Sequence, residues 1–583
     1  MPISDVFRPR IGAKLRRLYG DRAEGVLRRI DASVDRHGSL RQAAPRSPWD
    51  ERTVLLITYG DQVQSRGRPA LEVLGEFLHE HGLDRVFAGM HLLPFFPYSS
   101  DDGFSVIDYR QVRPPLGDWS DVDRLSHSFD LMFDFVVNHC SQRHAWFQAY
   151  LRGEAPYVDF FIEVEPGTDL SQVTRPRSLP LLTPFETSRG TKHVWTTFSA
   201  DQVDLDFSNP DVLVEMLDVL LLYLERGAKA IRLDAIGFLW KRIGTTCMHL
   251  PETHAVVKIL RDLVDDVAPG TVLLTETNVP HHENVGYFGE GDEAHAVYQF
   301  SLAPLLLDAF LTGDAEPLSR WLAGLEFPGP GLRFFNFTAS HDGIGVRPLE
   351  GLVSQDRLDA LVEGVRRRSG LVSTRRRPDG VDVPYELNVT YFSALDAPEG
   401  LAPDVHARRF LASQGVMLAI RGVPGVYFHS LVGTPNDREG VEKTGQNRAI
   451  NRRKYDLDEL RQMLRDESSP QRMVFDGYRR MLAVRTAQPA FHPDAEQVVV
   501  DAGQRSVIAF ARTSLDGRQR ILVLANTADR AVRVALPPVG DGALDRDLLS
   551  GRPVGRGDYE LGAYETAWLA SGREASATGH PTR

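Results

Sequence analysis

Three acidic residues follow apolar segments of the kind that form buried β-strands. Asp234 ends the segment AKAIRLD, Glu276 ends TVLLTE, and Asp342 follows RFFNFTASH. Carboxyl groups at neighbouring strand ends can divide the work of glycoside cleavage with retention. One acts as nucleophile, one as general acid and base, and one stabilises the oxocarbenium-like transition state. The sequence therefore predicts this chemistry for the three residues.

Basic side chains accompany these carboxylates. Arg232 precedes Asp234 by two positions, so both side chains point to one face of an extended strand, where the guanidinium keeps the carboxylate ionised. His139 follows the apolar segment DLMFDFVV and is expected to donate hydrogen bonds to sugar hydroxyls, and His341 stands beside Asp342. A single acidic residue after a strand is often only a helix N-cap or a loop residue. The whole set together favours the catalytic interpretation.

The elements that position these residues alternate between two patterns from residue 53 onward. Seven apolar segments have the composition of buried strands: TVLLITY, RVFAGMHLL, DLMFDFVV, KAIRLD, TVLLTET, RFFNFTAS and GVYFH. Amphipathic segments such as PDVLVEMLDVLLLYLERG separate them and indicate helices. This alternation predicts an α/β fold, a (β/α)8 barrel in which residues at the carboxyl ends of the strands surround the substrate-binding mouth.

The barrel pattern accounts for only part of the chain. We expect a helical N-terminal extension over residues 1–50, the barrel over 51–485, a C-terminal antiparallel β domain over 486–572 and a disordered tail over 573–583. The β domain is indicated by a period of two in EQVVVDA, SVIAFAR, RILVLAN, AVRVALP and YETAWLA. Two stretches at 150–205 and 343–410, rich in Pro, Gly and charge, are expected to be insertions over the barrel mouth.

Composition excludes several classes of function. The 583 residues include 79 acidic and 67 basic side chains, and the net charge of −12 argues against a nucleic-acid partner. Two cysteines exclude a disulfide framework and thiolate metal cages. The sequence lacks an apolar run long enough to span a membrane and a glycine-rich phosphate loop. We therefore expect a cytoplasmic protein without a nucleotide cofactor.

Several motifs resemble those of a known family. FDFVVNH, AIRLDAIGF, LLTETN and TASHDG resemble the four signature regions of glycoside hydrolase family 13, the α-amylase family. HLLPFFPYSSDDGFSVIDY, RPRSLP, PYELNVTYFSAL and GQNRAINRRKY resemble the sucrose phosphorylase branch of that family. Within the branch, TYGDQ, EGVEKTGQNRAINR and the N-terminal extension are most similar to the glucosylglycerate phosphorylases. The resemblance covers most of residues 53–480 and implies a (β/α)8 barrel with inserted domains and a C-terminal β domain.

The resemblance also implies roles for individual residues. Asp234 would form a β-glucosyl ester, Glu276 would be the general acid and base, and Asp342 would stabilise the transition state. The residues that would bind the donor glucose are Arg232, His139, His341, Asp101 and Phe104, with Arg448 paired to Asp101. Tyr385 and Glu386 would shape the acceptor and phosphate site. Sucrose phosphorylases have Gln at the position of Glu386, and this difference argues against fructose as the acceptor.

The implied activity is reversible phosphorolysis of 2-O-α-D-glucosylglycerate to α-D-glucose 1-phosphate and D-glycerate. The alternatives are a sucrose or sucrose 6-phosphate phosphorylase, a hydrolase or transglucosidase of the same family, and a non-catalytic barrel that binds sugar or protein. The expected partners are thus the sugar substrate and inorganic phosphate as co-substrate. Relatives often bind calcium near the position of Asn138, but the sucrose phosphorylase branch does without it, so no metal is expected.

Inorganic phosphate as the second attacker requires cations near the carboxylates. The candidates in loops expected over the mouth are Arg175, Arg177, Lys443, Arg448 and Arg452. The same cations are candidates for binding an anionic acceptor. The triplets 366–368 and 375–377 are all arginine and flank a Gly/Ser stretch, which is typical of a flexible, solvated loop.

Overall fold

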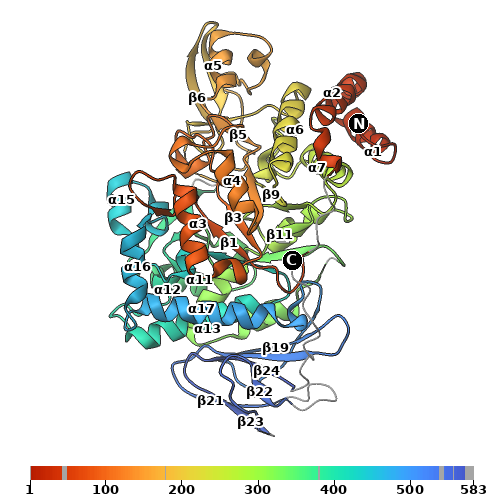
Figure 1. Cartoon of the computed structure of the whole chain (residues 1–583). Helices are drawn as coiled ribbons and strands as arrows, with labels where there is room; N and C mark the ends of the chain where they lie inside the picture. The colour runs from red at the N-terminus through yellow and green to blue at the C-terminus, as the bar shows by residue number, and fades with distance from the viewer. Residues whose placement is uncertain are drawn as a thin grey trace.

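A closed barrel of eight parallel strands forms the centre of the molecule (Figure 1). The structure is a computed structural model that describes residues 2–42, 49–177, 179–327, 329–377, 381–536, 544–555 and 557–571. The expected disordered tail at 573–583 therefore lies outside the described residues. The barrel strands are β1 (Leu55–Thr58), β3 (Gly89–Leu92), β4 (Asp130–Phe135), β9 (Ala230–Leu233), β10 (Val272–Thr275), β11 (Ala296–Tyr298), β12 (Arg333–Asn336) and β16 (Val423–Tyr427). The predicted fold class is confirmed.

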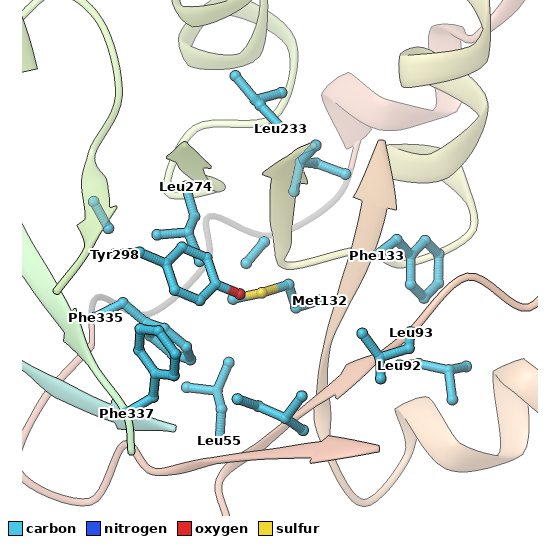
Figure 2. Close-up of a cluster of buried hydrophobic side chains, with 14 of the residues drawn as sticks. Leu55, Leu92, Leu93, Met132, Phe133, Leu233, Leu274, Tyr298, Phe335 and Phe337 are labelled. Atoms are coloured by element: carbon cyan, nitrogen blue, oxygen red, sulfur yellow. The ribbon is translucent and has the colours of Figure 1, made fainter. Parts of the chain in front are cut away.

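The strand that the sequence analysis did not identify is β11. It has three residues, which is too short for a recognisable apolar period, yet it pairs in parallel with both β10 and β12. Its Tyr298 belongs to a buried apolar cluster to which several barrel strands contribute (Figure 2). Leu55, Met132, Leu274 and Phe335 come to this cluster from β1, β4, β10 and β12.

Helices surround the barrel. They include α3 (Ala70–Glu80), α4 (Trp119–Ser126), α6 (Pro210–Glu225), α7 (Pro251–Val267), α9 (Leu302–Thr312), α10 (Glu316–Ala323), α13 (Pro403–Ala419), α16 (Leu457–Arg465) and α17 (Pro470–Thr486). Proline at the first position of α6, α7, α13 and α17 fixes φ where no intrahelical N–H bond is lost. Within the described ranges, no helix combines the length and apolar character needed to cross a membrane.

The first insertion lies between β4 and β9. It contains β5 (His139–Ser141), α5 (Ala145–Arg152), the hairpin of β6 (Leu182–Thr187) and β7 (Gly190–Trp195), and β8 (Gln202–Asp204), which pairs with β5. The hairpin and α5 project at one end of the molecule (Figure 1). The β5–β8 pair joins this insertion to the barrel mouth, since His139 is its first residue.

The second insertion follows β12. It forms a three-stranded sheet in the order β13 (Ile344–Gly345), β15 (Asp382–Asn388) and β14 (Leu371–Arg376), with α11 (Gln355–Arg367) between β13 and β14 and α12 (Tyr391–Ala394) after β15. A further mouth segment follows β16: α14 (Phe428–Leu431), α15 (Arg438–Thr444) and the 3₁₀ helix η10 (Asn447–Asn451). The antiparallel pairing of β14 with β15 shifts register between Ser373 and Thr374.

Two further parts flank the barrel. The N-terminal helices α1 (Arg8–Tyr19) and α2 (Ala23–Arg36) pack against α7 and α6. The C-terminal part has a five-stranded sheet in the order β18 (Glu496–Val499), β19 (Val507–Thr513), β20 (Arg520–Asn526), β24 (Thr566–Ala570) and β22 (Arg546–Asp547), with a second pair of β21 (Val532–Ala535) and β23 (Asp558–Leu561). It lies at the opposite end of the molecule from α5 and β6 (Figure 1).

Candidate active site

A cavity of about 1220 Å³, including its open mouth, lies at the carboxyl ends of the barrel strands. All three predicted catalytic carboxylates line it. The predicted substrate-binding residues that also line it are Asp101, Phe104, His139, His341, Tyr385, Glu386 and Arg448. Arg232 is not among the lining residues and is only 2% exposed, but it contacts Asp234. Segments separated by more than 300 residues thus contribute to one concave site.

Asp234 follows β9 directly and is held by Arg232. Arg232 Nη1 donates to Asp234 Oδ1 at 2.7 Å and also pairs with Asp134, the residue opposite it on β4. His91 Nε2 lies 2.7 Å from the other oxygen of Asp134. The sequence analysis missed Asp134 and His91, although an acidic residue inside the otherwise apolar strand DLMFDFVV was a usable signal. The buried Asp134 orients Arg232, and Arg232 orients Asp234.

Glu276 follows β10 at the register position next to Asp234, since Leu233 and Thr275 are paired. The backbone N–H of Ala235 donates to Glu276 Oε2 at 3.2 Å. Burial raises the pKa of both carboxyl groups, and Arg232 opposes this rise. Asp234 accepts a direct hydrogen bond from Arg232, whereas Glu276 Oε2 is 4.0 Å from that guanidinium. The direct hydrogen bond from Arg232 therefore favours the ionised form of Asp234 more than that of Glu276.

Asp342 has a different environment. Arg448 Nη1 lies 2.5 Å from Asp342 Oδ1, and Arg452 Nη2 lies 3.8 Å from the same oxygen. Although burial opposes ionisation, these two guanidinium groups hold the pKa of Asp342 well below its ordinary range. The three carboxyl groups of the cavity thus have different electrostatic environments, as the separate roles of a retaining glycosidic mechanism require.

Arg448 connects Asp342 to the second insertion. Its Nη2 and Nε donate to Oε1 and Oε2 of Glu386 at 2.9 and 3.2 Å, and the backbone N–H of Gly343 donates to Glu386 Oε1 at 3.0 Å. A Cβ atom at Gly343 would lie 2.5 Å from Glu386 Cγ, so the close contact of the residue 343 backbone with Glu386 requires glycine. Glu386 is only 3% exposed and is fixed by a charge-assisted, bidentate pair.

The predicted pairing of Arg448 with Asp101 is wrong. Asp101 is instead paired with Arg452, whose Nη1 lies 3.3 Å from Asp101 Oδ1, and with Arg177 at 3.7 Å. Arg448 lies on η10 and Arg452 directly follows it. The sequence therefore places both arginines at the same mouth but does not show which of them contacts Asp101. The carbonyl of His341, 2.8 Å from Arg452 Nε, turns Arg452 toward Asp101.

An aromatic pair forms one wall of the site. The rings of Phe104 and His341 are stacked with centroids 4.6 Å apart and planes 6° apart. Burial lowers the pKa of His341 to about 3, so the imidazole is neutral at physiological pH. His139 Nε2 donates to the carbonyl of Phe104 at 2.9 Å, and burial lowers its pKa as well. Asp101 has a φ of 52°, a left-handed conformation that is strained for a non-glycine residue.

The structure separates the five candidate phosphate cations. Arg175 and Arg177 line the cavity, and Arg448 and Arg452 pair with the carboxylates described above. Lys443 does not line the cavity. It pairs with Glu439 on α15 at 2.6 Å and is 70% exposed, because the helix turns this side chain to solvent.

The cavity residues that the sequence analysis did not select include Asn278, Arg347 and Arg375. Arg375 was assigned to a solvated loop, but it lies on β14 with its side chain in the cavity wall. The triplet of arginines concealed this because alternate residues of a strand point to opposite faces.

The place beside Asn138 is filled by an ammonium group. Lys241 Nζ lies 2.7 Å from Asn138 Oδ1 and 2.6 Å from Asp204 Oδ2. In the part of the chain that the structure describes, no group of three or more His, Cys, Asp and Glu side chains is arranged to hold a metal ion.

Known proteins are similar to this chain over both the barrel and the C-terminal part. Residues 76–319 match the catalytic domain of α-amylase, and residues 504–569 match the C-terminal immunoglobulin-like domain of D-apionate lactonase. The chain is 49% identical to the glucosylglycerate phosphorylase of Spirochaeta thermophila over 91% of this chain and 92% of that protein. It is 45% identical to the glucosylglycerate phosphorylase of Allomeiothermus silvanus over 95% of this chain and 96% of that protein. A solved structure of sucrose 6F-phosphate phosphorylase from Thermoanaerobacter thermosaccharolyticum is 28% identical with a TM-score of 0.71, covering 84% of this chain and 95% of that one.

Proposed function

The chain belongs to the glucosylglycerate phosphorylases of the α-amylase family, and we propose that it catalyses the reversible phosphorolysis of 2-O-α-D-glucosylglycerate to α-D-glucose 1-phosphate and D-glycerate. The observation that carries the mechanism is the cavity in which Arg232 holds Asp234, burial raises the pKa of Glu276, and Arg448 and Arg452 lower the pKa of Asp342. The arginines around this site suit an acceptor and a co-substrate that are both anions.

In the first step, the carboxylate of Asp234 attacks C1 of the glucosyl group and forms a β-glucosyl ester. The bond from C1 to O2 of glycerate breaks, and Glu276 transfers its proton to that oxygen. The ionised Asp342 stabilises the positive charge that develops on the sugar ring. The stacked rings of Phe104 and His341 are both uncharged, so the sugar can pack against this aromatic wall without desolvating a charge.

In the second step, hydrogen phosphate replaces glycerate. Its oxygen attacks C1 and displaces the Asp234 carboxylate, and its proton passes to the Glu276 carboxylate, which recovers the protonated form. The product is the dianion of α-D-glucose 1-phosphate, so atoms and charge balance over both steps. Because two inversions occur at C1, the α configuration is retained.

The approach of a dianion to three carboxyl groups requires compensating charge. We assign this role to Arg175 and Arg177 of the first insertion, which line the cavity beside Asp101. Arg448 is committed to Asp342 and Glu386. Glu386 stands where sucrose phosphorylases have Gln, so the charge next to the acceptor differs from that in enzymes that bind neutral fructose.

The test is release of glucose 1-phosphate from glucosylglycerate, sucrose and sucrose 6-phosphate, each with and without inorganic phosphate, and with Asp234→Asn as the inactive control. We expect consumption of glucosylglycerate that depends on phosphate. Preferential consumption of sucrose or sucrose 6-phosphate would contradict the acceptor. Free glucose formed at the same rate without phosphate would identify a hydrolase and contradict the phosphorylase mechanism.

A further inference from the structure

The cavity contains more arginine than the donor site requires. Its lining includes the arginines Arg175, Arg177, Arg347, Arg375 and Arg448. Arg448 is saturated by Asp342 and Glu386, and Arg177 leans toward Asp101 at 3.7 Å. Arg347 and Arg375 come from the second insertion, and neither pairs with a carboxylate of the donor site. Their position therefore points to a role on the acceptor side.

A short chain of contacts leads from the general acid to Arg347. Asn278 follows Glu276 by two residues and lines the same cavity. A Cβ atom on Gly345 would lie 2.4 Å from Asn278 Nδ2, so the Asn278 amide packs directly on the Gly345 backbone. Arg347 follows Gly345 by two residues. Asn278 Oδ1 is buried and has no hydrogen-bond partner among the described residues, so this side of the acceptor site offers an unused acceptor atom.

Arg347 follows β13 and Arg375 lies on β14, so the two arginines come from the segments on either side of the central strand β15. The N–H of Val346 donates to the carbonyl of Tyr385 at 3.1 Å, while Arg375 on β14 is in register with Val383. Both arginines thus flank the short segment of β15 that ends in Tyr385. Burial raises the pKa of Tyr385 to about 12, so its hydroxyl stays protonated and can donate a hydrogen bond at physiological pH.

Each of the two guanidinium groups has an N–H group without a partner. The Nε atom of each is buried and has no hydrogen-bond partner within the described ranges. Arg347 Nη2 lies 3.4 Å from both oxygens of Glu283, which is a long distance for a charge-assisted pair. Arg375 Nη2 donates at 3.0 Å to Glu350, whose side chain is 50% exposed. These carboxylates orient the arginines without saturating them.

Resting on the proposed function, we propose that Arg347, assisted by Arg375, binds the carboxylate of D-glycerate and thereby selects an anionic acceptor. The carboxyl carbon of glycerate is bonded to C2, whose oxygen accepts the proton of Glu276, so the carboxylate lies within a few bonds of the reacting oxygen. A guanidinium group forms charge-assisted hydrogen bonds to a carboxylate, and a neutral polyol cannot replace this charge. Arg175 and Arg177, on the wall made by the first insertion, are left for phosphate.

The experiment measures transfer of glucose from glucose 1-phosphate to two acceptors, D-glycerate and glycerol, which differ in the carboxylate. The variants are Arg347→Gln, Arg375→Gln and Arg347→Lys. Arg376→Gln is the matched control, because Arg376 is adjacent on β14 but 53% exposed and paired with Asp382 outside the cavity. The Michaelis constant for phosphate is measured in the phosphorolysis direction with the same enzymes. Far-UV circular dichroism and thermal unfolding verify that each variant is folded.

We expect Arg347→Gln to lower the preference for glycerate over glycerol, as a ratio of kcat/KM values, by about 30-fold or more. A single bidentate carboxylate pair is worth a factor of this size. Arg375→Gln should lower the ratio less, Arg347→Lys should be intermediate because charge is kept and the fork is lost, and Arg376→Gln should match the wild type.

The outcomes separate this inference from the proposed function. A wild-type enzyme that uses glycerate, together with an Arg347→Gln variant that keeps the wild-type ratio, overturns the subsite alone. The same holds if Arg347→Gln raises the Michaelis constant for phosphate and leaves the ratio intact, because Arg347 would then bind phosphate. A wild-type enzyme that does not transfer glucose to glycerate overturns the proposed function and the subsite together.

Discussion

The substitution Glu386→Gln tests whether the second insertion acts on the donor site through Arg448. In the structure, Glu386 accepts two hydrogen bonds from Arg448 and one from the N–H of Gly343, while Arg448 also holds Asp342 at 2.5 Å. Gln is nearly isosteric, but its amide N–H₂ replaces one of the two acceptor oxygens and faces a donor of Arg448. The change therefore removes one charge and at least one hydrogen bond from a buried network.

The magnitude follows from the geometry. Two unit charges about 4 Å apart attract by about 4 kcal/mol at an effective dielectric constant of about 20. Gln retains part of the hydrogen bonding, so a net cost of about 1.5–3 kcal/mol remains. In the variant, Asp342 is the one carboxylate left to neutralise Arg448. Arg448 therefore attracts Asp342 more strongly and draws it away from the positive charge that develops on the sugar. A loss of this size in transition-state stabilisation corresponds to a fall of about 10- to 100-fold in kcat/KM.

The assay compares two reactions of glucose 1-phosphate: hydrolysis, which needs only the donor site, and transfer to glycerate. Glu386→Gln should slow both by a similar factor, because Asp342 serves both. Asp382→Asn is the control, since Asp382 starts the same strand, is 42% exposed and pairs with Arg376. If hydrolysis is unchanged and only transfer to glycerate falls, Glu386 acts on the acceptor directly and the reasoning through Arg448 is refuted.

Three further predictions concern the catalytic pair and the N-terminal helices. Asp234→Asn should lower turnover by about 1,000-fold or more, and mass spectrometry should detect no trapped glucosyl-enzyme. A trapped glucosyl-enzyme in this variant would place the nucleophile elsewhere. Phosphorolysis requires protonated Glu276, whose pKa is raised by burial, so kcat/KM should be lost as pH rises through that pKa. Glu276→Gln should remove this basic limb and slow poor leaving groups more than activated ones, and an unchanged limb would exclude Glu276 as the acid. Asp262→Asn removes a buried carboxylate on α7 that pairs with Arg10 and Lys14 of α1, each at 2.6 Å. It should lower the thermal unfolding midpoint and leave kcat unchanged; an unchanged midpoint would show that apolar packing alone holds α1 in place.

Several features of the site were accessible from local sequence because they depend on strand ends. Asp234 and Glu276 follow apolar segments directly, and in a parallel barrel every such position meets at one mouth. The pairing of Arg232 with Asp234 follows from the period of two in a strand. His139, by contrast, was expected at the end of a barrel strand, and it lies on the separate strand β5, which pairs with β8 of the first insertion.

Other features depended on contacts between distant segments. The short strand β11 is a strand only because β10 and β12 pair with it on both sides. Asp134 on β4 is the partner of Arg232 because those two residues are opposite in the β4–β9 register. No pattern within either strand reports that register.

The sequence by itself determined the fold class and the type of catalytic chemistry, because both follow from residue types and from periods of two and 3.6 along the chain. Only the tertiary structure decided which charges meet. It paired Asp101 with Arg452 and Arg448 with Asp342 and Glu386, and it brought Arg347 and Arg375 into the cavity wall. Coulomb and hydrogen-bond energies depend on distances of a few ångströms between groups far apart in the chain, and folding alone sets those distances.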